Sequence, residues 1–495
     1  MRARWPKPLV QEGIQAIVLR TISPQPTLWE AILPECALGL PRGLGEVDAW
    51  LDDPRFFEPF IEFFDPRIGR PSIPMETFLR MMFLRFRYKL GYEALCAEVT
   101  DSLSWRRFAR IPLGCPVPHP STLEKIVTRT GTAAIDALNE ALLAKAGENK
   151  LIKTDKVRAD TTVVPANVAY PTDSRLLAKG VARLALLTTR IRAAGLAART
   201  TSRDRTASVR RRAHDIGAWL RRRSEEAKAE VLVLNAEMAR IAIAAVTEAT
   251  DVVRNARRSL RRRGVVISSA PWALVAELEA LAATVATIAA QTLTRAGGEI
   301  PDGATRIVSL HDTDARPIAK GRLGKPVEFG YKAQIVDNVD GVILDHLVVK
   351  GNPPDAPMLV PAIARITARF GRVCRAVTAD RGYGEAGVQA SLHELGVKTV
   401  AIPRRGRANK ERERIQRAKG FTKLVKWRTG SEARIACVKR DWGWSRTLMD
   451  GEAGAATWCG WGVLAHNTMK CSTLMSDRHG PGPPGQPPPP RTTNL

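Results

Sequence analysis

A long helix-patterned segment that interrupts strand-like sequence is the feature that most constrains this fold. Residues 171–300 are rich in Ala, Leu and Arg, contain few helix-breaking residues, and predict two or three long helices. No strict heptad repeat continues far enough to require a coiled coil. Before this segment, residues 156–165 are β-branched and alternating, which predicts a strand. Strand-like sequence returns at residue 304, so the chain is expected to combine a sheet with a large helical part.

The region after the helical segment alternates predicted strands and helices. Strands are expected at 306–311, 329–337, 342–349, 375–380 and 398–402, and helices at 357–370 and 385–395. A turn at residues 338–341 ends in Gly341 and predicts a hairpin between the second and third strands. This alternation indicates an α/β architecture.

The N-terminal 150 residues read as short helices joined by turns. An amphipathic pattern starts at residue 74, and further helices are expected at 92–99 and 105–109. Ser121, followed three residues later by Glu124, predicts a helix N-cap with a capping box. Short helices with basic residues between them suit a helix-turn-helix DNA-binding module, although an ordinary small helical bundle fits the same pattern.

The charge of the chain points to a polyanionic partner. Its 76 Lys and Arg residues against 50 Asp and Glu residues give a net charge of +26, with +11 in 171–300 and +11 in 401–440. Nucleic acid is the first candidate and an anionic membrane surface the second. The membrane alternative is weaker, because the most apolar stretch, 273–294, carries Glu277 and Glu279. Seven scattered cysteines without a CxxC pair, and an N-terminus without an apolar signal region, favour a reducing cytoplasm.

Three acidic residues stand in settings that differ from the rest. Asp160 lies in the first predicted strand, Asp380 ends a later one, and Glu432 lies in a basic stretch of helical spacing. An acid at the carboxyl end of a strand points into the crevice where open α/β sheets bind ligands, although one such Asp alone is usually a turn residue or a helix cap. Three acids on a basic chain favour hard oxygen-ligated metal ions, because two Mg²⁺ ions about 4 Å apart can drive phosphoryl transfer.

At these residues the sequence resembles the bacterial insertion-sequence transposases of the DDE class. Asp160, in RADTTVV, matches the first Asp of that family, and Asp380, in ADRGY, matches the second. Between these two acids lie 219 residues, so the resemblance implies an insertion after the first strand, which is the segment 171–300.

The third acid of the family is matched by Glu432 and the residues around it. Arg428, Glu432 and Lys439 have the spacing of the family's YREK signature and are expected on one helical face, while Val425 stands at the Tyr position. Since that Tyr is associated with phosphate contacts, its loss bears on fine positioning and leaves the metal ligands intact.

The resemblance implies a fold and its division into domains. The fold class is α/β, with an RNase H-like mixed-sheet core, an N-terminal all-helical domain and a helical insertion. The expected boundaries are a DNA-binding domain at 1–150, a core formed by 151–170 and 301–475, the insertion at 171–300, and a disordered Pro- and Gly-rich tail at 476–495.

The resemblance also implies an activity. A transposase of this class would cut the ends of an insertion sequence and join them to target DNA, using Mg²⁺ or Mn²⁺, with two ions held by Asp160, Asp380 and Glu432. Its partners would be the terminal inverted repeats, the target DNA and a second copy in a homodimeric active complex. It would work at the bacterial nucleoid in the cytoplasm, without a membrane. No nucleotide cofactor is implied, because the sequence contains no P-loop motif.

Four basic residues are expected to contact DNA, and two alternatives to transposition stay open. The basic residues are Arg428, Lys439, Lys325 and Arg381, and Lys332 on the predicted hairpin is a further, weaker candidate. The first alternative is a metal-dependent nuclease on the same core. The second is a non-enzymatic DNA-binding protein derived from a decayed transposase, for which Val425 and the Pro-rich tail are the arguments.

Overall fold

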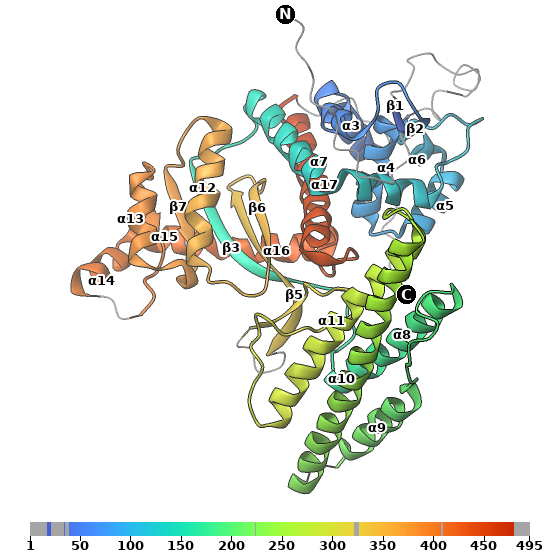
Figure 1. Ribbon diagram of the computed structural model, residues 1–495. Helices are drawn as coiled ribbons and strands as arrows, with labels where there is room; N and C mark the ends of the chain where they lie inside the picture. Colours follow the sequence, from blue (N-terminus) through green and yellow to red (C-terminus); the bar gives the residue numbers. More distant parts are fainter. Residues whose placement is uncertain are drawn as a thin grey trace, which may run out of the picture.

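The computed structural model describes residues 17–20, 34, 39–222, 224–320, 326–406 and 409–479, and shows a mixed α/β protein built on a six-stranded sheet (Figure 1). The strands are β3 (Lys156–Pro165), β4 (Arg316–Ala319), β5 (Val327–Asn338), β6 (Ile343–Lys350), β7 (Ala376–Ala379) and β8 (Thr399–Ala401). The sheet order is β4-β5-β3-β7-β8, with β6 also paired to β5. The expected mixed-sheet α/β class is therefore confirmed.

Strand β3 lies at the centre of the sheet. It pairs antiparallel with β5 and parallel with β7, and β7 continues in parallel to β8. Strands β5 and β6 form the predicted hairpin, closed at Asn338 and Gly341. Strands β5, β6, β7 and β8 confirm four of the five strands expected after the insertion, each within two residues of its predicted bounds.

The strand expected at 306–311 is wrong, and the strand at this edge of the sheet is β4 instead. Residues 306–311 are irregular, because side chains bind the backbone of the turn that follows. Ser309 Oγ accepts the Asp312 N–H at 3.1 Å, and an Asp312 carboxylate oxygen accepts the Ala315 N–H at 3.2 Å. Short polar side chains that bind nearby backbone groups compete with a strand ladder in this way.

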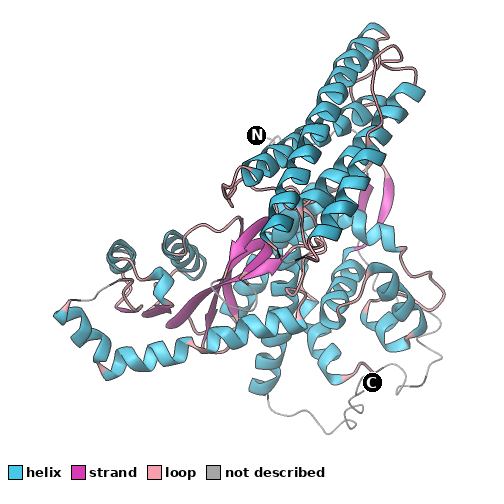
Figure 2. Cartoon of the chain, turned by 90° about the horizontal axis from the view of Figure 1, so that it is seen from below, coloured by secondary structure: helices cyan, strands magenta, loops and turns pink. Residues whose placement is uncertain are grey.

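Helices cover both faces of the sheet (Figure 2). The helices after the hairpin are α12 (Ala356–Phe370), the 3₁₀ turn η3 (Arg381–Tyr383), α13 (Ala386–Glu394), α14 (Lys410–Arg417), α15 (Lys419–Arg428), α16 (Gly430–Asp441) and α17 (Gly451–His479). α15 packs against β7 and β8, and α16 packs against β3 and β5, so the basic segment 410–441 runs along one face. α12 contacts β6 and α13 on the other.

The N-terminal region is mainly helical and shares its core with the sheet. Its elements are α3 (Arg42–Leu51), η1 (Pro54–Phe56), η2 (Glu58–Phe63), α4 (Met75–Tyr88), α5 (Tyr92–Asp101), α6 (Leu103–Phe108) and α7 (Pro120–Glu148). Helix α17 packs against α3, α4, α7 and β6, and one apolar cluster extends from Leu44 to Cys471. The two parts are therefore joined by a continuous core.

Two details of the N-terminal region correct the sequence-based expectation. The region is not all-helical, because β1 (Ile17–Arg20) and β2 (Arg70–Pro74) form a two-stranded parallel sheet. Pro71 and Pro74 interrupt helical sequence, and an isolated two-stranded pair tolerates their missing N–H groups. Helix α7 begins at Pro120, and its N-cap is His119, whose Nδ1 accepts the Ser121 N–H, so Ser121 is not the N-cap. Pro occupies the first helical position, where its missing N–H costs nothing.

Over residues 171–222 and 224–300 the structure shows a bundle of four helices, one or two more than expected. They are α8 (Asp173–Ala193), α9 (Thr206–Trp219), α10 (Glu225–Arg262) and α11 (Ala270–Ala296), and they enclose a second apolar cluster (Figure 1). Within the described residues, α11 is the one helix long and apolar enough to cross a membrane, with a mean hydropathy of 1.7. It packs against α8 and α10, and its Glu277 pairs with Arg183 at 2.7 Å.

A buried carboxylate connects the two ends of the bundle. Asp173, at the start of α8, is 5% exposed and accepts a hydrogen bond from Gln291 Nε2 of α11 at 3.2 Å. It also pairs with Arg295 at 3.2 Å and with Arg306 at 3.9 Å. The insertion therefore leaves the sheet and returns to it at nearly the same place. The tail predicted to be disordered lies mostly outside the described residues, and residues 476–479 belong to α17.

Candidate active site

Two of the three predicted acids lie side by side where the parallel pairing of β3 with β7 ends. The pairing of β3 with β7 ends at Ala159 and Ala379, so Asp160 and Asp380 are the next residues on the two neighbouring strands. Asp160 continues along β3, where its carboxylate accepts the Thr161 N–H at 2.9 Å. Asp380 leaves the sheet and caps η3, accepting the Gly382 N–H at 2.8 Å. Strand pairing alone therefore brings these two carboxylates together.

The closeness of the two carboxylates is reflected in their acidities. Burial, followed by the negative charge of Asp380, raises the pKa of Asp160 from 3.8 to about 6. Burial also raises the pKa of Asp380, and here the neighbouring charge that contributes most is that of Asp355. The site thus holds acidic groups that repel one another in a poorly solvated place, which is typical of functional sites.

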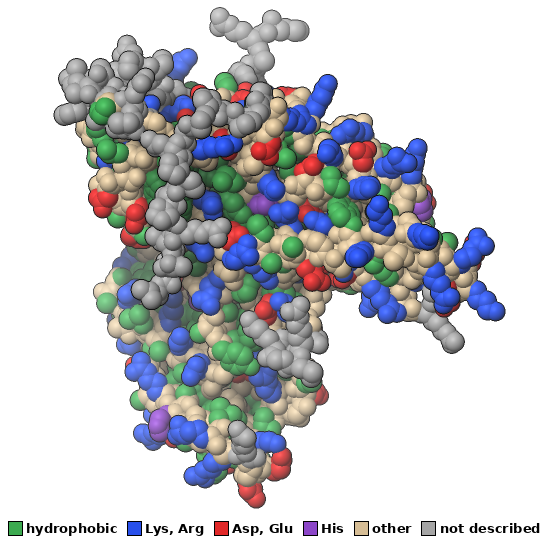
Figure 3. Space-filling view, turned by 180° about the vertical axis from the view of Figure 1, so that it is seen from behind, with side chains coloured by type: hydrophobic (Ala, Val, Ile, Leu, Met, Phe, Trp, Pro, Cys, Tyr) green, Lys and Arg blue, Asp and Glu red, His purple; other side chains and the backbone are tan. Residues whose placement is uncertain are grey.

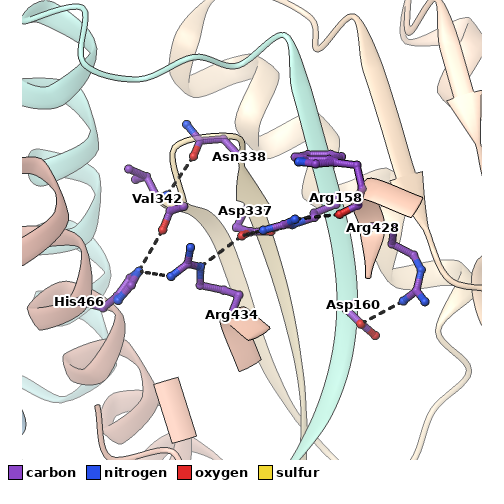
Figure 4. Close-up of polar contacts among 10 residues, drawn as sticks. Arg158, Asp160, Asp337, Asn338, Val342, Arg428, Arg434 and His466 are labelled. Atoms are coloured by element: carbon purple, nitrogen blue, oxygen red, sulfur yellow. Dashed lines mark hydrogen bonds and ion pairs between the residues drawn. The ribbon is translucent and has the colours of Figure 1, made fainter. Parts of the chain in front are cut away.

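Arg428, at the end of α15, supplies the cation that faces this acidic pair. Its Nη1 lies 3.3 Å from Asp160 Oδ2, and the side chains of both residues are largely buried (Figure 4). The positive charge of Arg428 lowers the pKa of Asp160 and also that of Asp380. The predicted basic residue therefore lies at the acids themselves.

Glu432 lies near the pair without joining it. It is exposed in the first turn of α16, and its charge contributes to the raised pKa of Asp160. In the part of the chain that the structure describes, no three His, Cys, Asp or Glu side chains are grouped to hold a metal ion. A site in which Asp160, Asp380 and Glu432 share metal ions thus stays a prediction.

The other residues expected to contact DNA lie at different distances from the acids. Arg381 is exposed at the cleft, and its guanidinium donates to the backbone carbonyls of Arg404 and Gly406, each at 3.1 Å. Lys439 is half-buried in the last turn of α16 and lies near Cys459 of α17, where burial raises the pKa of the thiol and the Lys439 charge offsets part of that rise. Lys325 is outside the described residues.

The expected single helix through the signature residues is divided into two. Arg428 ends α15, while Glu432 and Lys439 belong to α16, with Thr429 between the helices. Thr429 keeps right-handed helical angles, so α16 follows nearly in the direction of α15. Val425, which stands at the Tyr position of the signature, is half-buried in α15.

A cleft of about 780 Å³ opens beside the acids, and it contains Lys332, a weaker candidate from the sequence, and Asp355, which the sequence did not indicate. Its lining includes Thr161, Thr162, Asp380, Arg381, Lys332 and Asp355. Lys332 Nζ pairs with Asp355 at 2.5 Å and donates to the Pro353 carbonyl at 2.6 Å.

Lys332, the weaker DNA-contact candidate on the predicted hairpin, is 7% exposed and faces this cleft from β5. Asp355 follows two prolines directly before α12, in sequence that predicts an ordinary helix start, which explains why it was overlooked.

Comparison with known families assigns domains to both parts of the chain. Residues 40–129 match the family described as "Transposase domain (DUF772)", and residues 303–468 match the "Transposase DDE domain". Both parts of the chain are therefore similar to families described as transposase domains. The DDE domain match contains Asp380 and Glu432, whereas Asp160 and the helical insertion lie between the two matched ranges.

One curated relative and the solved structures add little beyond the families. The chain is 28% identical over 136 residues to "Uncharacterized protein ORF8 in nfe locus" from Rhizobium meliloti. This match covers 26% of the chain and 65% of the relative, so the chain spans less than two thirds of that protein. No solved structure matches the chain.

Proposed function

We propose that this transposase-domain protein cuts the ends of an insertion sequence and joins them to target DNA. The observation that carries the proposal is the placement of Asp160 and Asp380 on neighbouring parallel strands, beside Arg428 and a cleft with a basic rim. The mixed sheet, with one acid in its central strand and another directly after the neighbouring parallel strand, supports an RNase H-like core. The match of residues 303–468 to a transposase DDE domain supports the class of reaction.

The acids present fit a divalent metal ion. Carboxylate oxygens are the ligands that Mg²⁺ and Mn²⁺ take, and a cation between Asp160 and Asp380 would relieve the repulsion that raises the pKa of Asp160. In this proposal Asp160 and Asp380 would hold two metal ions, and Glu432 of α16 would supply the third carboxylate ligand. When bound, such ions polarise the phosphate and make an attacking water or hydroxyl more acidic.

The protein's own residues orient the DNA strand in this proposal. Arg428, at the acids, and Arg381, at the rim of the cleft, would contact phosphate oxygens on either side of the bond to be cut. Asp160, with a pKa of about 6, is mainly ionised above neutral pH and can then accept a cation. The acids would repel DNA by themselves, so the surrounding arginines and lysines are needed to hold the strand.

Basic surfaces away from the cleft would supply most of the DNA affinity. Lys and Arg side chains gather over the part of the molecule that carries α12–α15 (Figure 3). Exposed basic residues on α14 and α15 include Lys410, Arg414, Arg417, Lys419, Lys423 and Lys426. In this proposal they contact phosphates, the N-terminal helices bind the terminal inverted repeats, and the insertion holds the DNA in a homodimeric complex.

A strand-transfer assay tests the proposal directly. The protein is incubated with a DNA fragment that carries the element's two ends, a target plasmid and Mg²⁺, and both cut and joined products are measured. Asp160→Asn and Asp380→Asn should each abolish cutting, whereas Asp477→Asn, at an exposed acid of α17, should behave as wild type. Cutting that persists in both site variants would refute the proposal, and cutting without joining would favour the nuclease.

A further inference from the structure

A buried carboxylate on β5 binds two arginines that come from different elements, β3 and α16. Asp337 is 1% exposed and receives two hydrogen bonds from Arg158, from Nε at 2.7 Å and from Nη2 at 2.8 Å (Figure 4). Arg434 Nε donates a third at 3.2 Å. Charged forks of this kind fix geometry as well as charge, because an arginine–carboxylate pair has a preferred planar arrangement.

Arg158 connects Asp337 to the strand that carries the first acid. It lies two residues before Asp160 on β3, so both side chains point to the same face of the sheet. On that face Arg158 Nη1 donates to the Trp427 carbonyl at 2.9 Å, and the guanidinium lies 4.7 Å from the centre of the Trp427 ring. Arg158 therefore holds the last turn of α15 against β3, one residue before Arg428.

The fit between Arg158 and the helix junction is close. A Cβ atom on Gly430, the first residue of α16, would lie 2.2 Å from Arg158 Nη1, which leaves no room for a side chain. The guanidinium thus fills the space between β3 and the junction of α15 with α16.

Arg434 connects the same carboxylate to the helix that carries Glu432. It lies two residues after Glu432 on α16 and reaches Asp337 with its Nε, while its Nη1 lies 3.5 Å from His466 Nε2 on α17. His466 Nε2 is also 3.0 Å from the Gly341 carbonyl, at the hairpin turn between β5 and β6. The two arginines thus link β3, β5, α16 and α17 around one buried carboxylate.

Apolar packing does little to hold this junction in place. α15 has no buried residue, and α16 buries Ser431 and Val438, with Ile435 and Cys437 partly buried against the core. The contacts of Arg158 and Arg434 are therefore well suited to decide where the junction lies on the sheet. A residue that fixes the position of this junction also sets the distance between Glu432 and Asp160.

We infer that Asp337, with Arg158 and Arg434, is a positioning unit that sets α16, and hence Glu432, against the Asp160–Asp380 pair. This inference rests on the proposed function for its consequence in catalysis, while its structural part stands on the contacts alone. None of the three residues lines the cleft, so they act through the helix junction and not on the DNA.

The test uses Arg434→Met, because this change leaves the Arg158–Asp337 pair intact and should leave the fold intact with it. Hydrogen–deuterium exchange should become faster in residues 427–436, with no change in β7. Cleavage should slow on the order of tenfold to a hundredfold, as expected for a misplaced catalytic group. The Mg²⁺ concentration for half-maximal thermal stabilisation should rise roughly tenfold, as for loss of an outer-shell partner. Affinity for DNA should stay within about twofold.

Two matched variants separate positioning from loss of charge. Arg440→Met makes the same change on the same helix, at an arginine that pairs with its neighbour Asp441, and it should behave as wild type. Arg434→Lys keeps one donor for Asp337 and should restore at least half of the lost rate.

The inference is overturned if Arg434→Met leaves exchange and Mg²⁺ affinity unchanged, or if Arg440→Met produces the same losses. If the wild-type protein neither cuts nor joins DNA, the proposed function fails. The exchange and Mg²⁺ measurements still decide the positioning role in that case.

Discussion

Replacing Asp160 by Asn should make the protein more stable at neutral pH while it removes activity. Asp160 is 9% exposed, and its pKa is about 6, against 3.8 for an ordinary Asp. At 1.36 kcal/mol per pKa unit, ionised Asp160 destabilises the folded protein by about 3 kcal/mol at neutral pH. Asn carries no charge and can still accept the Thr161 N–H, so it avoids this cost.

The sign of the effect gives it a distinctive pH dependence. Because the folded protein binds the Asp160 proton more tightly than the unfolded chain does, the cost is absent below pH 3.8 and grows as pH rises toward 6. The stability gained by Asp160→Asn should therefore be up to about 3 kcal/mol at pH 7.5 and about 1 kcal/mol at pH 4.5. These values are upper limits, because Asp160→Asn also removes the ion pair with Arg428, in which the two side chains lie 3.3 Å apart.

Urea unfolding of both proteins in EDTA, at pH 7.5 and pH 4.5, measures this difference. Adding Mg²⁺ at pH 7.5 should then stabilise the wild-type protein and leave the variant unchanged, because a ligand stabilises the form that binds it. A variant that is less stable than wild type at pH 7.5, or a gain that is equal at both pH values, would refute the reasoning. Burial of ionised Asp160 would then not destabilise the folded protein.

Three further predictions follow from the site and its surroundings. Asp380→Asn should abolish cleavage in Mg²⁺ and leave gel-shift affinity for the element's ends unchanged or slightly tighter, because the lost charge repels phosphate when no metal is bound; retained cleavage would place the metal site elsewhere. Affinity for DNA should fall with salt with a log–log slope steeper than about −2, and a shallower slope would mean that the charges of 171–300 and 401–440 do not meet DNA. Gly430→Ala should lower the unfolding midpoint and slow cleavage, since its Cβ would lie 2.2 Å from Arg158; Gly420→Ala, where a Cβ meets nothing within 4 Å, is the control, and equal effects of the two would contradict the close fit.

The strands that build the site could be predicted because their sequences are short, apolar and bounded by turns. β3 begins and ends at the residues expected from its alternation, and β7 falls within the expected range before Asp380. Each acid directly follows the last residue of the parallel pairing between β3 and β7, so the closeness of Asp160 to Asp380 follows once the strands are neighbours.

Contacts between distant segments could not be predicted from the pattern. Arg158 and Asp337 are 179 residues apart, and their pairing depends on the register of β3 against β5, which no local pattern specifies. Lys332 reads as an exposed hairpin residue, because alternation does not say which face of a central strand a cleft will occupy. Asp355 reads as a helix start, because its partner Lys332 is supplied by another strand.

The carboxylate at the base of the insertion also bears on how the chain folds. Strands β3 and β5 must pair although a loop from Pro165 to Val327 separates them, and closing long loops slows folding. Once Asp173 is held beside Gln291, the loop left to close is shorter by about two doublings, which lowers the entropy cost of closure by about 1 kcal/mol. If the helical bundle of the insertion forms first, from its own local contacts, it would bring β5 next to β3. The central sheet, and with it the meeting of the two aspartates, would then depend on the early folding of a segment that contributes no residue to either.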